Sequence, residues 1–96
     1  MIGLTPIQRQ MARHALFGLE EGRLKRTFRN RFAVGGGDSP KKDAWNDLMA
    51  KGAATGWSDV HSRMTFYHLT RLGAQSALKK GESLDPEDFP EEADDA

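Results

Sequence analysis

The chain has 96 residues, with 14 Lys and Arg, 14 Asp and Glu and no cysteine, so we expect one small domain without disulfides or thiol ligands. No apolar run approaches the roughly 18 residues of a membrane span. The first residues also lack the basic start and apolar stretch of a secretory signal. We therefore expect a cytoplasmic protein with no membrane partner.

The neutral net charge is the sum of two unlike parts. Residues 1–81 hold all 14 basic side chains and six acids, a net charge of +8, whereas residues 82–96 hold eight acids and no Lys or Arg, a net charge of −8. A basic body with an acidic tail predicts a surface for a polyanion or an acidic protein, and a segment that can compete for that surface.

The segment Thr5–Gln8 has the composition of a helix start, with a capping threonine, a proline in the first turn and a glutamine that completes a capping box. An apolar stripe at helical spacing follows, formed by Ile7, Met11, Ala15 and Leu19. Arg9 and Arg13 fall on the other side of this helix, which we expect to end near Gly22.

Residues 27–34 predict a half-buried strand, because Phe28, Phe32 and Val34 alternate with Thr27, Arg29 and Arg31. Asn30 falls on the apolar side of this strand, where its amide needs hydrogen-bond partners. Continuation of the first helix through residue 26 is the alternative. The three glycines at 35–37 predict a loop.

A second helix is expected from Ser39, as the cap, to Gly52, which stops it. Its buried stripe is predicted to contain Ala44, Trp45, Leu48 and Met49. Residues 53–69 then predict two short strands joined by a polar turn, and Thr70 is expected to cap a last helix. That helix has apolar positions at Leu72, Ala74, Ala77 and Leu78 and is expected to end at Gly81.

The acidic tail, residues 82–96, contains two prolines and only Leu84 and Phe89 as larger apolar side chains. Burying so few apolar side chains does not offset the entropy that the chain loses when it becomes ordered. We therefore expect the tail to be disordered or only loosely docked. The domain itself is predicted to span residues 3–81.

The predicted order is helix, strand, helix, strand, strand, helix. Residues 45–52 read Trp-x-x-Leu-x-x-x-Gly, and residues 66–78 read Phe-x-x-Leu-Thr-x-x-Gly-x-x-x-Ala-Leu. The two segments and the hairpin between them resemble the end of winged-helix domains. The chain also resembles small uncharacterised proteins of phages and prophages, chiefly through the run Phe-Arg-Asn-Arg-Phe at 28–32 and the closing segment at 66–78. The resemblance covers residues 5–80 with short motifs.

The winged-helix resemblance implies an α+β fold and DNA binding. A full winged helix, however, has a helix-turn-helix pair between its first strand and the wing. Residues 35–52 have room for only one helix of about three turns. The resemblance therefore implies a reduced, winged-helix-like domain without a standard recognition helix.

Few residues indicate catalysis or metal binding. His61 and His68 flank the predicted hairpin with Asp59 nearby, but no metal-binding spacing occurs, so isolated histidines are favoured. Ser58 and Ser62 near His61 lack a nucleophile motif. The glycine run at 35–37 lacks the phosphate-loop pattern and is interpreted as a plain loop. We expect no enzyme activity, no cofactor and no metal.

The strongest functional candidate is a basic segment that places five cations in nine residues: Arg23, Lys25, Arg26, Arg29 and Arg31. Arginine makes bidentate contacts to phosphate, and Phe28 is interleaved, so the segment predicts DNA or RNA binding. The alternatives are a solvated basic face, or a face that holds the acidic tail.

Aromatic side chains offer a second kind of contact. Trp45 lies in a helical apolar stripe and is expected in the core, whereas Trp57 is either core or exposed. Tyr67 faces away from Phe66 and is interpreted as an exposed anchor for a partner. Leu84 and Phe89 are candidates for docking the tail into a partner.

We thus expect a winged-helix-like α+β domain with a flexible acidic tail. The leading hypothesis is a non-enzymatic phage or prophage accessory protein that binds nucleic acid through its Arg-rich face and hairpin. The alternative is a protein-interaction module, an inhibitor or assembly factor, whose partner is a host or phage protein and whose contacts are the hairpin and the tail.

Overall fold

The computed structural model describes residues 1–90. Its elements are α1 (Pro6–Phe17), the 3-10 helix η1 (Gly18–Glu20), β1 (Phe32–Gly35), α2 (Ser39–Ala50), β2 (Ala54–Asp59), β3 (Met64–Leu69) and α3 (Arg71–Ala77). Three helices and a three-stranded antiparallel sheet confirm the predicted α+β class and the order helix, strand, helix, strand, strand, helix.

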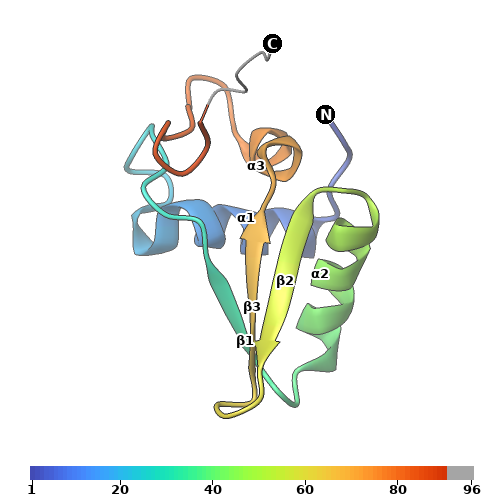
Figure 1. The fold of residues 1–96 in the computed structure, drawn as a ribbon. Helices are drawn as coiled ribbons and strands as arrows, with labels where there is room; N and C mark the ends of the chain where they lie inside the picture. Colours follow the sequence, from blue (N-terminus) through green and yellow to red (C-terminus); the bar gives the residue numbers. More distant parts are fainter. Residues whose placement is uncertain (91–96) are drawn as a thin grey trace.

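The sheet has the order β1-β3-β2, so β3 is central and both neighbours run antiparallel to it. Because side chains alternate along a strand, two sets of residues point to opposite faces. Tyr67 pairs with Phe32 and Gly56 on the inner face, which α1 and α2 cover (Figure 1). Phe66 pairs with Trp57 on the opposite side, which we call the outer face.

The core forms where α2 meets the inner face. The ring of Trp45 stacks on Tyr67 at 5.0 Å and lies 5.4 Å from Phe32, measured between ring centroids. Trp45 is fully buried as predicted, and its Nε1 has no hydrogen-bond partner among residues 1–90, so packing holds the indole in place. The Tyr67 ring lies directly over Gly56, where a Cβ atom would approach it to 2.8 Å.

Helix α1 begins as predicted, with Thr5 as cap and a complete capping box with Gln8. Its buried face is rotated from the predicted stripe. Leu19 is exposed because α1 ends at Phe17, whereas Arg13 is buried, with 2% of its surface accessible. Arg13 was expected on the solvent side; acidic partners compensate its charge, as described below. The other buried residues of the helix are Gln8, Met11, Ala12, Ala15, Leu16 and Phe17.

Strand β1 is shorter than predicted, because residues 27–31 are irregular. Thr27 is buried and Phe28 is exposed, the reverse of the predicted alternation. Asn30 has the hydrogen-bond partners that its position required: its amide donates to the Leu69 carbonyl at 3.0 Å, and its oxygen accepts from the Leu69 N–H at 2.8 Å. The side chain thus extends the pairing of β1 with β3 past the end of the strand.

The remaining boundaries are set by local capping. Asp38, not Ser39, caps α2, and its carboxylate accepts from the Lys41 N–H at 3.4 Å. Gly52 has a φ of 76° and follows the end of α2 as predicted. Thr70 caps α3, as expected from the sequence, and the hairpin of β2 and β3 is also confirmed.

A single helix, α2, connects β1 to β2, and it is followed directly by the hairpin. The helix-turn-helix pair of a full winged helix is therefore not formed between these strands in the described residues. No helix within residues 1–90 is long and apolar enough to cross a membrane.

Residues 82–90 pack on the body of the domain through specific contacts, whereas a tail that is disordered or only loosely docked was expected. Phe89 is buried, and Ser83 forms a parallel bridge with Arg26. An ion pair and several hydrogen bonds, described below, hold this segment in place. The number of apolar residues in the segment does not predict these contacts. The predicted disorder of residues 91–96 lies outside the described residues, and a domain limited to residues 3–81 stays a prediction.

Candidate nucleic-acid interface

The five predicted cations lie in one irregular segment between η1 and β1. We call residues 21–31 the basic loop. Four of its cations are exposed and one, Arg29, is half-buried; the exposed ones are Arg23, Lys25, Arg26 and Arg31. In Figure 1 the loop connects the C-terminal end of α1 to the edge strand β1. The structure therefore places the predicted basic residues together.

The backbone of the basic loop is held on both sides. Ser83 brackets it, since the Ser83 N–H donates to the Lys25 carbonyl at 2.8 Å and its carbonyl accepts from the Thr27 N–H at 3.0 Å. The Asp85 N–H donates to the Thr27 hydroxyl at 2.9 Å. On the other side, the Arg31 N–H donates to the Ala15 carbonyl at 3.2 Å. A fixed backbone limits the entropy that the loop loses when it binds a ligand.

The acidic neighbours of the loop bind its cations weakly. Arg23 lies 3.7 Å from Glu20, and Arg26 lies 3.9 Å from Asp85, in pairs that are open to solvent. Such exposed pairs contribute about 0–1 kcal/mol, so they leave both arginines available to a phosphate. Arg29 differs, because its guanidinium lies against Gly18 and donates to the Arg31 carbonyl at 3.0 Å.

Arg31 connects the basic loop to the outer face of the sheet. Its guanidinium carbon lies 4.4 Å from the centroid of the Phe66 ring. The Phe66 ring in turn lies 5.0 Å from Trp57, with 35° between the two planes. Trp57 is 54% exposed, which resolves the two interpretations of this residue in favour of a surface position. A cation and two aromatic rings thus form one continuous surface.

Tyr67 does not belong to this surface. It was expected to be an exposed anchor, but it is 3% exposed, and burial raises the pKa of its phenol. The alternation in β3 is as predicted, but the inner face receives Tyr67 because Trp45 of α2 stacks on it. Phe66, which the sequence analysis did not single out, is the outer-face residue. Its pairing with Trp57 across the hairpin is the signal that identifies it.

A shallow groove of about 260 Å³ lies beside Trp57, between β2 and α2. Its polar lining includes Lys42, Asn46 and Ser58, and none of the described residues that line it is acidic. Ser58 and Thr65 share a hydrogen bond of 3.1 Å at its edge. Because Gly56, Ser58 and Thr65 alternate with Trp57 and Phe66 along the hairpin, the groove belongs to the inner-face side of the sheet and only borders Trp57.

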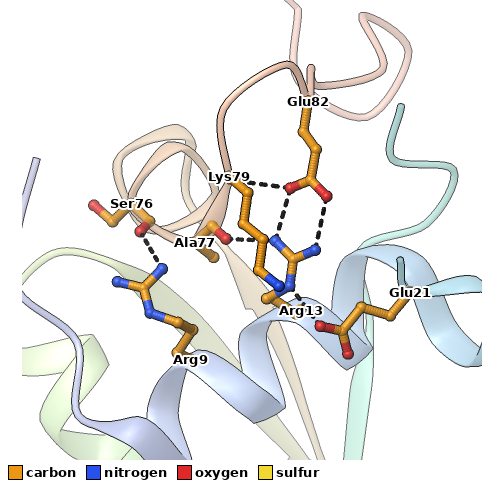
Figure 2. Close-up of polar contacts among 7 residues, drawn as sticks. All are labelled: Arg9, Arg13, Glu21, Ser76, Ala77, Lys79 and Glu82. Atoms are coloured by element: carbon orange, nitrogen blue, oxygen red, sulfur yellow. Dashed lines mark hydrogen bonds and ion pairs between the residues drawn. The ribbon is translucent and has the colours of Figure 1, made fainter. Parts of the chain in front are cut away.

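Behind the basic loop, Arg13 forms a buried ion pair that the sequence analysis did not identify (Figure 2). Its Nη1 and Nη2 each lie 2.7 Å from an oxygen of Glu82, its Nε lies 2.6 Å from Glu21, and its Nη1 also donates to the Ala77 carbonyl at 2.8 Å. These carboxylates raise the pKa of the Arg13 guanidinium. The guanidinium lowers the pKa of Glu82 from 4.5 to about 2, helped by the Lys79 N–H.

This ion pair explains why residues 82–90 are ordered. Glu82 fixes the start of the segment, and the Arg71 guanidinium donates to the Phe89 carbonyl at 2.6 Å near its end. Phe89 is 4% exposed and Leu84 is half-buried, so the two residues expected to dock into a partner pack on this chain instead. Glu82 thus anchors this segment to the domain, and its role is structural. The sequence had suggested only that it adds to the negative charge of the tail.

The histidines do not gather into a cluster. His61 lies in the turn of the hairpin, and His68 lies near the far end of β3. The Asp59 carboxylate accepts from the His61 N–H at 3.1 Å and from the Ser62 hydroxyl at 3.0 Å, which shapes the turn. Within residues 1–90, no group of three His, Asp or Glu residues is arranged to hold a metal ion.

No protein-family model matches the chain, and no curated protein or solved structure matches it either. What is established is a small α+β domain with a three-stranded antiparallel sheet. Function has to be argued from the surface itself, since one fold hosts many functions.

Proposed function

We propose that this protein binds nucleic acid through the basic loop and the adjoining outer face of the sheet. The observation that carries the proposal is the contact of Arg31 with Phe66, because it joins the exposed cations of the loop, through the half-buried Phe66 ring, to the exposed indole of Trp57. Cations bind the phosphates of a polyanion, and aromatic rings bind bases. An acidic protein would bind the cations through its carboxylates, and this binding would not require aromatic rings beside them.

The protein-interaction alternative receives less support. Two of the residues that were to form its contacts, Tyr67 and Phe89, are buried in the protein itself. Trp57 remains exposed, but it belongs to the surface that Arg31 extends. A non-enzymatic role, a phage or prophage origin and a winged-helix relationship stay hypotheses, and the proposal depends on none of them.

The test removes two exposed cations from the loop. The double variant Arg23→Gln/Lys25→Gln leaves the backbone anchors of the loop in place, because those anchors involve no atom of either side chain. We expect its affinity for a short DNA strand at roughly 50 mM salt to fall about tenfold, since two phosphate contacts are lost. The slope of log K against log salt should become shallower by about 1.4. Fluorescence anisotropy measures both quantities.

The matched control is Lys41→Gln/Lys51→Gln, which makes the same charge change on α2 and its C-terminal end. Both lysines also sit in exposed ion pairs, with Asp38 and Asp47. We expect this variant to bind within about twofold of the unmodified protein, because long-range charge is screened at this salt. If the two double variants lost affinity equally, the DNA strand would be attracted by the net charge of the protein alone. That result would contradict a defined interface.

A further inference from the structure

We propose that the ligand is single-stranded, with its bases stacked on Trp57 and Phe66 and its phosphates held by the basic loop. This inference rests on the proposed function and specifies its substrate class. Arg31, Phe66 and Trp57 come from the region of β1, from β3 and from β2, so the three planar groups lie in a row across all three strands. Such a row can receive successive bases of one strand.

Larger outer-face neighbours lie along the strands: Met64 and His68 flank Phe66 on β3, and Asp59 follows Trp57 on β2. The two remaining neighbours are small. Ala33 pairs with Phe66 on one side, and Thr55 is the outer-face residue preceding Trp57 on β2. Neither is large enough to cover an aromatic face, and α1 and α2 pack on the opposite side of the sheet. The indole of Trp57, which is 54% exposed, is therefore open to a flat group from solvent, and the half-buried ring of Phe66 lies beside it with Arg31 over it.

A duplex is the poorer occupant of this surface. In a duplex the faces of the bases are covered by their neighbours, so only an unpaired strand can offer them to Trp57 and Phe66. Reading a duplex through its major groove requires an inserted helix or a two-stranded ribbon. The outer face is instead the broad side of a three-stranded sheet, and α2 is committed to the core through Trp45 and Leu48.

Charge complementarity supports the same occupant. Arg23, Lys25 and Arg26 are exposed in the same loop as Arg31, which lies at the β1 end of the row, away from Trp57. Several cations at one end of the two rings match a strand whose phosphates run past stacked bases.

The experiment compares two substitutions at Trp57 on two ligands, an oligothymidylate of about 12 nucleotides and a duplex of the same length. Trp57→Leu keeps an apolar side chain without an aromatic face, whereas Trp57→Phe keeps the face. We expect Trp57→Leu to weaken single-strand binding about tenfold and Trp57→Phe to weaken it less than threefold. Duplex binding should change in neither variant. Both should fold, because Trp57 is a surface residue.

Val60→Ala provides a matched control, because Val60 is an exposed apolar residue in the turn of the same hairpin. It should bind both ligands as the unmodified protein does. Single-strand binding that Trp57→Leu leaves unchanged, together with a loss in the basic-loop variant, would overturn the stacking inference and leave the proposed function standing. Binding to neither ligand at low salt would overturn both.

Discussion

The substitution Glu82→Gln should lower the free energy of unfolding by about 3 kcal/mol, because it removes the charge that compensates a buried guanidinium. The Glu82 side chain is 5% exposed and accepts two hydrogen bonds of 2.7 Å from Arg13. Without that charge, the polar partners that Arg13 keeps among residues 1–90 are Glu21, which is far more exposed, and the Ala77 carbonyl. Urea unfolding followed by circular dichroism measures the difference.

The control for this prediction is Glu87→Gln, the same chemical change in the same segment. Glu87 is exposed, and its backbone N–H donates to the Asp85 carboxylate at 3.0 Å. We expect a change within about 0.5 kcal/mol. If the two variants had the same stability, the Arg13–Glu82 pair would not be an anchor of the fold.

The same ion pair predicts how stability depends on pH. The pKa of Glu82 is about 2 in the folded protein, against an ordinary 4.5, because Arg13 stabilises the charged form. Since the folded-state pKa is the lower one, the contribution is complete above pH 4.5 and is lost as the pH falls toward 2. The stability difference between the unmodified protein and Glu82→Gln should therefore shrink across this window. Urea titrations at about pH 6, 4 and 3 test it; a constant difference would contradict the assignment.

The substitution Gly73→Ala should lower the free energy of unfolding by about 3 kcal/mol or more, because the added methyl group has no room. A Cβ atom at Gly73 would lie 2.0 Å from the carbonyl oxygen of Ala53 and 2.9 Å from its carbonyl carbon. That oxygen also accepts from the Thr70 N–H at 3.0 Å, so neither α3 nor the start of β2 can shift without losing a hydrogen bond. Thermal unfolding followed by circular dichroism measures the loss.

Gly3→Ala is the matched control. A Cβ atom at Gly3 would meet nothing within 4 Å, so its melting temperature should stay close to that of the unmodified protein. An unchanged melting temperature for Gly73→Ala would mean that α3 does not pack as closely on Ala53 as the structure has it.

Local signals in the sequence predicted most of the fold. Thr5 and Thr70 cap their helices because a hydroxyl followed three residues later by a backbone N–H is a short-range arrangement. Gly52 follows α2 with a positive φ for an equally local reason. The pairing of Arg13 with Glu82 joins residues 69 positions apart, and nothing near either residue indicates it. Order in residues 82–90 was missed for this reason.

The candidate site was predicted in part. The five cations of the basic loop are adjacent in sequence, so their clustering followed from composition. Alternation in β3 separated Phe66 from Tyr67 but did not show which face α2 would cover, so Tyr67 was assigned to the surface in place of Phe66. The stretch before β1 alternates as a strand does, but Ser83 and Asp85 hold Thr27 inward and leave Phe28 exposed.

The central claim is that an exposed basic loop and an aromatic sheet face bind a nucleic-acid strand. The most direct test is fluorescence anisotropy of a labelled oligothymidylate with the full chain across a salt series. With four exposed cations, Arg23, Lys25, Arg26 and Arg31, each contacting a phosphate, log K should fall with log salt at a slope of about −3. The affinity should then drop roughly 50-fold between about 50 and 200 mM salt. The absence of binding at low salt, or an affinity that does not change with salt, would contradict the account.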